Sequence, residues 1–277
     1  MALQGWYKSG EELLDEMKTT KLPEKMTALW FLGQAGIVVK TGNTLIAIDP
    51  YLEDRDVRTF PVPFEPSQAD LFDFVICSHD HGDHLNYHTV SEIAKNAENT
   101  RFIIPAPHVR KVCGLGVSEG RIIPAHENRD ICLQEGITVT PVRAMHDEFH
   151  VDENGDYEDM GFVIRIPGAV LYHSGDTVEW DTMVEDLAPY GIDVALLPIN
   201  GSDWKRKHRD CIGNLNYREA ADVAGGIGAD LLIPLHFDLF ANNSENPAFL
   251  VDYMHRMYPG RKCHVMVPGE RFVYLRG

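Results

Sequence analysis

Cysteine is scarce in this sequence, and its spacing matches no cysteine-based site. The five cysteines are an odd number and include no CxxC pair. This argues against a disulfide framework and against a thiolate zinc site. Free thiols that are buried or half-buried are the expected alternative.

Long apolar runs are also missing. No stretch approaches the roughly 20 uninterrupted apolar residues of a membrane helix. The first residues do not place a cationic segment before an apolar run, as a secretory signal does. We therefore expect a cytoplasmic protein that does not enter a membrane.

Basic residues are few for the length of the chain. Lysine and arginine number 25 against 42 aspartates and glutamates, which gives a formal net charge of −17. Such a charge repels a phosphate backbone and argues against general nucleic-acid binding. We expect bound divalent cations to neutralise part of this acidity, because coordinating carboxylates are counted in the formal charge.

The remaining composition, 44% hydrophobic and 24% charged, is that of an ordinary globular protein. No repeat and no linker rich in proline, glycine and serine divides the chain. We therefore predict a single domain over residues 1–277, built around one large core.

The apolar pattern predicts more strands than helices. ALWFLG, GIVVK and TLIAIDP are predicted to form an antiparallel meander, because Gly36 and the turn dipeptide Gly42-Asn43 separate them. Further apolar runs of strand length are FVICS (74–78), RFIIPA (101–106), ITVTPV (137–142), GFVIRI (161–166), AVLYHS (169–174), VALLPI (194–199) and LLIPLH (231–236).

Helical periodicity alternates with some of these strands. EELLDEM follows Ser9, which has capping-box spacing to Glu12. The other helical segments are VSEIAKNA, NYREAADVAGGIG and NPAFLVDYMHRMY. Two sheets that carry helices on one side must bury their other faces against each other. The predicted fold is therefore α/β, a four-layer αβ/βα sandwich.

The most informative segment is FVICSHDHGDHLN, in which a predicted buried strand runs into a loop rich in metal-ligand side chains. His79 and His81 are two apart in an extended segment, so they project to the same side and can chelate one ion. A turn at Gly82 would let Asp83 and His84 face a second ion. A polar loop can carry several histidines without function, but this density has no obvious packing use.

This HxHxDH segment closely resembles the signature of the metallo-β-lactamase superfamily. The resemblance implies a third histidine after a strand, for which His146 is favoured over His150 by its place at the strand end. It implies a bridging aspartate in a Gly-Asp turn, which Asp176 matches, and a last histidine at the end of a late strand, which His236 matches.

The resemblance also implies a supporting role for Asp49, at the end of an early strand. It would hydrogen-bond the ligand loop and so fix the orientation of the imidazoles. A turn residue before Pro50 is the alternative interpretation. His173 is expected to be a packed residue or one that supports the ligands from behind.

These assignments imply two divalent cations, manganese or zinc. The first would be held by His79, His81 and His146, the second by Asp83, His84 and His236, with Asp176 between them. Imidazoles and carboxylates without thiolates suit zinc, manganese or iron. A hydroxide activated by the metals would attack a carbonyl, with Asp83 and Asp176 as the catalytic carboxylates.

The whole chain resembles one branch of the superfamily, the ascorbate-6-phosphate lactonases and their relatives. The resemblance is carried by WFLGQAGIVVK, SHDHGDHLN, PINGSDW and IPLHFDLFANNSENP. It implies opening of a lactone of a small phosphorylated sugar acid, manganese in the cell, and a homo-oligomer. The aromatic residues Trp6 and Tyr7 could take part in that assembly.

A basic island at residues 205–209 is the main clue to an anionic substrate. It follows a strand predicted to lie between those that carry Asp176 and His236, so it could reach the rim of the site. Arg206 and Arg209 are the candidate phosphate-binding residues, with Asn200 beside them as a hydrogen-bond donor. A solvated charged loop or a subunit contact is the alternative interpretation.

Two other functions remain open at this stage. A phosphodiesterase or nuclease could use the same dinuclear site, because a site that stabilises an oxyanion also serves phosphoryl chemistry. A non-catalytic metal-binding module is the alternative outside enzymes, but every expected ligand position carries a suitable residue.

Overall fold

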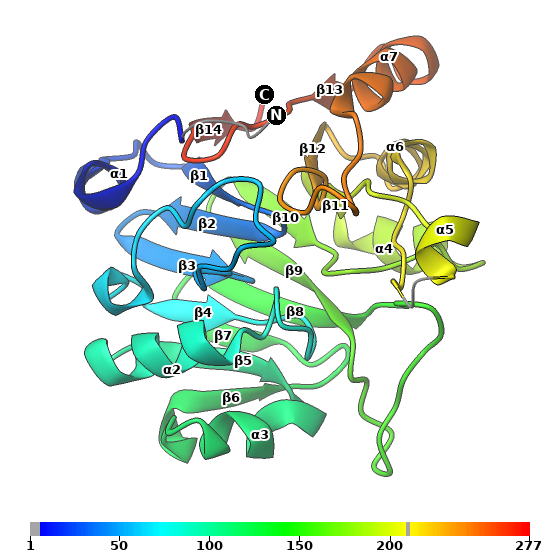
Figure 1. Cartoon of the computed structure of the whole chain (residues 1–277). Helices are drawn as coiled ribbons and strands as arrows, with labels where there is room; N and C mark the ends of the chain where they lie inside the picture. Colours follow the sequence, from blue (N-terminus) through cyan, green and yellow to red (C-terminus); the bar gives the residue numbers. More distant parts are fainter. Residues whose placement is uncertain (1–5, 209–210) are drawn as a thin grey trace.

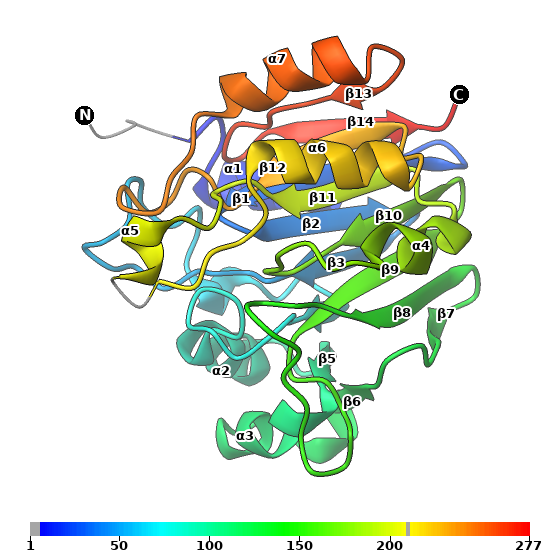
Figure 2. The ribbon, with the colours of Figure 1, turned by 90° about the vertical axis from the view of Figure 1, so that its right-hand side faces the viewer.

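Two seven-stranded sheets face each other in the computed structural model, which describes residues 6–208 and 211–277. Helices α1 (Gly10–Thr19), α2 (Tyr87–Asn96) and α3 (Val109–Gly114) cover the outer face of the first sheet (Figure 1). Helices α4 (Met183–Leu187), α6 (Tyr217–Gly226) and α7 (Pro247–Met257) lie on the other side of the molecule, against the second sheet (Figure 2). The predicted four-layer αβ/βα sandwich is confirmed.

The first sheet has the strand order β14-β1-β2-β3-β4-β5-β6. Strands β1 to β3 form the predicted antiparallel meander, and β3 to β6 run parallel. The bounds are β1 Met26–Gly33, β2 Gly36–Thr41, β3 Thr44–Ile48, β4 Phe74–Ile76, β5 Arg101–Pro105, β6 Ile122–Ala125 and β14 Arg271–Leu275.

The second sheet has the order β13-β12-β11-β10-β9-β8-β7. Strands β7 to β10 are antiparallel neighbours, and β10 to β13 are parallel. The bounds are β7 Ile131–Gln134, β8 Ile137–Arg143, β9 Met160–Ile166, β10 Ala169–His173, β11 Val194–Pro198, β12 Leu231–Leu235 and β13 Lys262–Cys263. The two sheets therefore share one pattern, with antiparallel strands on one side of the sheet and parallel strands on the other.

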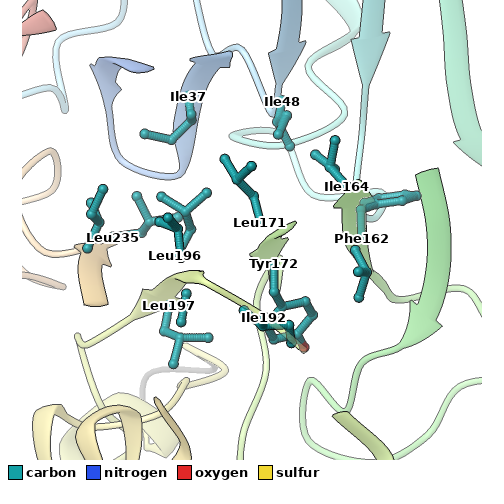
Figure 3. Close-up of a cluster of buried hydrophobic side chains, with 14 of the residues drawn as sticks. Ile37, Ile48, Phe162, Ile164, Leu171, Tyr172, Ile192, Leu196, Leu197 and Leu235 are labelled. Carbon is teal, nitrogen blue, oxygen red and sulfur yellow. The ribbon is translucent and has the colours of Figure 1, made fainter. Parts of the chain in front are cut away.

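The space between the sheets is filled by aliphatic side chains from both of them. In Figure 3, Ile37 and Ile48 of the first sheet point toward Leu171 and Leu196 of the second. The next residue in the same strand of the second sheet, Leu197, points to the opposite side, as the pleat requires. Because both faces of β10 and β11 are buried, their sequences read as continuous apolar runs.

Helix α1 is held by its buried face and not by the predicted capping box. Ser9 occupies the position before the helix, but its side chain makes no capping hydrogen bond. Leu13, Leu14 and Met17 are buried instead, and the indole nitrogen of Trp30 donates to Glu16 at 2.9 Å. The sequence spacing was right for the helix and wrong for the cap.

Several short elements carried too little periodicity to be predicted. They are β6, β7, β13, β14, α3, α4 and the four-residue helix α5 (Trp204–Lys207). The five cysteines, all in the described part of the chain, are free. None of the helices in the described ranges is long and apolar enough to cross a membrane.

Candidate metal centre

The candidate ligands follow strands that end at the same edge of the sandwich. His79 lies just after β4, His146 after β8, Asp176 after β10 and His236 after β12. These strands share a direction within each sheet, so their carboxyl ends meet at one edge. Loops at this edge are the usual place for ligand sites in sheets of this kind.

The loop after β4 turns back on itself before α2 begins. The amide of His84 donates to the carbonyl of His81 at 2.9 Å, and the amide of Leu85 donates to the carbonyl of His79 at 3.2 Å. Asn86 then caps α2 with its side-chain oxygen and donates through Nδ2 to the carbonyl of Gly82 at 2.8 Å. The end of the loop is thereby fixed to the start of a helix.

The loop that carries Asp176 comes very close to this turn. Gly175 has a φ of +61°, and a Cβ atom there would lie 2.7 Å from Cβ of Ser78. Only glycine fits both the backbone conformation and the contact. The Gly-Asp turn therefore brings Asp176 against the histidine loop of the first sheet.

Two groups of side chains converge at this edge, each with ligand atoms within 4.8 Å of one another. The first contains His79, His81, His146 and Asp176, and the second contains Asp83, His84 and His236. The structure thus brings together all seven residues that the sequence proposed as ligands.

Asp176 lies between the two groups. Its Oδ1 is 3.3 Å from Nε2 of His84, and its Oδ2 is 3.3 Å from Nε2 of His236. The same Oδ2 is 3.8 Å from Nε2 of His146 in the first group. One carboxylate therefore faces imidazoles of both groups.

The residues fit divalent cations. His79 Nε2, His84 Nε2 and Asp176 Oδ1 are buried and make no hydrogen bond, which is costly for polar atoms unless another partner binds them. Ligands with metal bonds of about 2.0–2.2 Å in tetrahedral geometry lie roughly 3.3–3.6 Å apart. The separations of 3.3–3.8 Å around Asp176 are close to that range.

The charge states of these groups also suit cations. Burial alone would raise the pKa of Asp176, but His236 and His84 hold it well below its usual range. Burial, reinforced by His84, pushes the pKa of His79 well below the usual value for histidine. The carboxylate is therefore ionised and this imidazole neutral at neutral pH, as metal ligation requires.

In the second group the imidazoles have raised pKa values. Burial opposes protonation of His236, but Asp176 and Asp83 outweigh it and raise the pKa of His236 to about 9. The pKa of His84 is raised in the same way, mainly by Asp176. The carboxylates thus create a strongly negative local field that a cation would satisfy in place of the protons.

Asp49 holds the histidine loop in place through hydrogen bonds to its carboxylate. Its Oδ1 accepts the backbone amide of Ser78 at 2.7 Å, and its Oδ2 accepts the Ser78 hydroxyl at 2.6 Å and Nδ1 of His84 at 2.8 Å. Because the carboxylate takes the Nδ1 hydrogen, the other ring nitrogen of His84 is directed at the cluster. Asp49 also has a left-handed backbone, with φ of +44°.

The two other histidines considered from the sequence lie outside the cluster. His150 pairs through Nδ1 with Asp159 at 2.7 Å and through Nε2 with Asp147 at 3.2 Å. His173 is fully buried, and its Nε2 donates to the carbonyl of Ala35 at 2.8 Å.

Two cavities open beside the clusters, with His146 and Ile212 lining both. Their volumes are about 860 Å³ and about 700 Å³. Charged residues in the first are Asp147, Glu179, Lys207 and Glu219. Charged residues in the second are Asp80, Lys111, Asp152, Glu153, Glu158 and Asp159. Carboxylates therefore outnumber cations in both.

Asn200 and Arg206, which the sequence predicted to bind substrate, do not lie at the cavities. Asn200 is fully buried and donates to Asn243 Oδ1 at 3.0 Å. Arg206 donates to the same oxygen at 2.9 Å and also pairs with Asp203. Neither of these two described residues lines the cavities, so their contacts hold the loop together. Arg209 lies outside the described residues.

Sequence reasoning missed Gln34, which follows β1. Its Nε2 lies 2.8 Å from Oδ2 of Asp83 and 2.7 Å from Nε2 of His236. A glutamine in a turn carries no periodic signal, and the contacts join residues far apart in the chain. The segment WFLGQAGIVVK contributed to the family resemblance, but it did not predict a role for the side chain of Gln34.

Comparisons with known proteins agree with this geometry. A family model described as beta-lactamase superfamily domain matches residues 44–237, a range that begins before Asp49 and ends just after His236. A UPF0173 metal-dependent hydrolase from Caldivirga maquilingensis is 27% identical over 245 residues, which cover 88% of this chain and 97% of that protein. Another from Saccharolobus solfataricus is 30% identical over 180 residues, which cover 64% of this chain and 73% of that protein.

Solved structures share the fold. Igni18, a metallo hydrolase from Ignicoccus hospitalis, aligns with a TM-score of 0.73 at 20% identity, covering 91% of this chain and 100% of that one. An isothiocyanate hydrolase from Delia radicum gut bacteria aligns with a TM-score of 0.71 at 15% identity, covering 90% and 99%.

Proposed function

Given that the chain belongs to the beta-lactamase superfamily and is a metal-dependent hydrolase, we propose that it opens a lactone of a small phosphorylated sugar acid. The observation that carries the proposal is the position of Asp176, whose carboxylate lies 3.3 Å from imidazole nitrogens of His84 and His236 in the second group and 3.8 Å from that of His146 in the first. A carboxylate so placed can be shared by two cations. The resemblance to ascorbate-6-phosphate lactonases supports the reaction type.

His79, His81 and His146 would hold one cation, and Asp83, His84 and His236 the other, with Asp176 shared. Manganese or zinc suits this set of nitrogen and oxygen ligands. When bound, such cations lower the pKa of water and polarise an ester carbonyl.

Asp83 and Asp176 act through charge and hydrogen bonding. Burial opposes their ionisation, but neighbouring histidines lower the pKa of both carboxyls, so both stay ionised at neutral pH. The side chain of Asp83 is 20% exposed against 5% for Asp176. Asp83 is therefore the carboxylate better placed to accept a hydrogen bond from an attacking water and orient it.

The cavities support a small substrate. Lys207, a member of the basic island, lines the larger cavity together with His146. Lys207 is therefore the proposed contact for an anionic group on the substrate. Asn200 and Arg206 would shape this wall indirectly through Asn243. The carboxylates around both cavities disfavour a polynucleotide, in keeping with the net charge of −17.

A hydrolysis panel tests the proposal. Protein stripped of metal is reconstituted with manganese or zinc and assayed on lactones, sugar-acid phosphates and phosphodiesters, with His81→Ala as the control. Lactone opening that needs metal and disappears in the variant is the expected result. Phosphodiester cleavage alone would overturn the substrate and keep the centre, whereas failure to bind either metal would overturn both.

We also propose a cytoplasmic homo-oligomer. Tyr7 is 67% exposed and available for a subunit contact, whereas Trp6 packs edge-on against Phe60 within the chain. Light scattering after size-exclusion chromatography tests the assembly, and a monomeric mass would refute it.

A further inference from the structure

Gln34 connects the two sheets at the metal centre through its backbone. It is the first residue after β1, and it accepts the amide of His236 through its carbonyl at 2.7 Å. Its own amide donates to Oδ1 of Asp238 at 3.0 Å. Gln34 and His236 both have left-handed backbones, with φ of +58° and +57°. Strained non-glycine residues of this kind concentrate at functional sites.

The side chain of Gln34 is buried, with 1% of the residue exposed. Its amide nitrogen lies 2.8 Å from Oδ2 of Asp83 and 2.7 Å from Nε2 of His236. These two atoms are themselves 3.4 Å apart, and both belong to the second group of ligands. A carboxamide nitrogen has two N–H donors, of which one donates to Asp83, whereas Nε2 of His236 can accept the other only when it carries no proton.

We propose that Gln34 is a positioning residue that sets the cation affinity of the second group, Asp83, His84 and His236. This inference rests on the proposed metal centre. The carboxamide donates to Asp83 and holds its orientation without adding charge, whereas lysine or arginine here would repel a cation.

A hydrogen bond from Gln34 to Asp83 is compatible with a bound cation, whereas one to Nε2 of His236 is not. A carboxylate oxygen has two lone pairs and can accept a hydrogen bond while it binds a cation, but a neutral imidazole nitrogen has only one. Gln34 would therefore keep Asp83 in place when a cation binds, while Nε2 of His236 would give its lone pair to the cation. The side chain of Gln34 contacts Asp83 and His236 of the second group, so the effect falls on one cation site.

Calorimetric titration of manganese, and separately of zinc, into metal-free protein tests the inference. Gln34→Met keeps the length of the side chain and removes the donor. One binding step should weaken by about 10–100-fold, the usual effect of losing a hydrogen bond to a metal ligand. The other step should stay unchanged. Gln134→Met is the matched control. It makes the same substitution on β7, an edge strand of the second sheet, and should leave both steps unchanged.

Gln34→Asn is the second variant, because it keeps the carboxamide but is one methylene too short to reach Asp83. It should weaken the same step, and it carries the test if Gln34→Met melts at a much lower temperature. Equal weakening of both steps, or no change in either variant, would overturn the role of Gln34 and leave the metal centre intact. Wild-type protein that binds neither cation would overturn the centre and this inference together.

Discussion

The carboxylate of Asp176 is 3.3 Å from His84 through one oxygen and 3.3 Å from His236 through the other. His84 belongs to the loop after β4 of the first sheet, and His236 follows β12 of the second. One side chain thus joins the two sheets electrostatically at the edge where both cavities open. This relationship makes the centre sensitive to the charge at residue 176.

Asp176→Asn should remove most of the cation binding. The amide keeps the shape but loses the charge that faces both groups, and a neutral oxygen is a weaker ligand. We expect metal content measured by atomic emission to fall from the proposed two ions per chain to one or none. An unchanged content of two would contradict the shared role of Asp176.

Metal-free protein should lose stability as the pH rises toward 9. The pKa of His236 is about 9 in the folded protein, because Asp176 and Asp83 outweigh burial, against about 6.5 when unfolded. The proton therefore contributes stability that is complete below about pH 6.5 and is lost as the pH rises through about 9, on the order of 3 kcal/mol. Thermal melts of metal-free protein should show this decline, and saturating manganese should remove it because the cation replaces the proton.

Asp49→Ala should destabilise the fold and weaken cation binding. The substitution leaves the amide and hydroxyl of Ser78 and Nδ1 of His84 without their buried acceptor. Losing such hydrogen bonds to a charged group costs about 3 kcal/mol, measurable by urea unfolding of metal-free protein. A variant as stable as the wild type would contradict a supporting role for Asp49.

Lys40→Met should affect stability and leave the metal centre alone. Lys40 is 3% exposed, and its ammonium donates to the carbonyls of Met17 and Lys18 at 2.6 and 2.8 Å in the last turn of α1. Removing it leaves both carbonyls without that donor, at a cost of about 1–3 kcal/mol in unfolding free energy. Cation affinities equal to the wild type confirm that the effect is local to α1.

Lys207→Ala should raise KM for an anionic lactone far more than it lowers kcat, because the lost contact is made equally in the ground and transition states. Arg206→Ala is the comparison, because its guanidinium contacts Asp203 and Asn243 and Arg206 does not line either cavity. A larger increase in KM for Arg206→Ala than for Lys207→Ala would instead assign the anion contact to Arg206.

Most strands and the longer helices could be predicted because their signal is local. β10 and β11 read as continuous apolar runs since both faces are buried, and α2 and α6 place their buried residues at helical spacing. β14 was missed because it lies at a sheet edge and only Tyr274 in it is buried. The predicted cap at Ser9 failed because spacing does not decide whether a side chain turns toward the helix.

The sequence by itself determined which residue types stand at the strand ends. His79, His81, Asp83 and His84 lie within one loop, so their proximity is guaranteed by the chain. Only the tertiary structure decided that Asp176 meets both His84 and His236, that Gln34 reaches Asp83, and that Lys207 and not Arg206 lines a cavity. The physical reason is that these contacts depend on how two sheets pack face to face. That packing is set by the whole buried core and not by neighbouring residues in the chain.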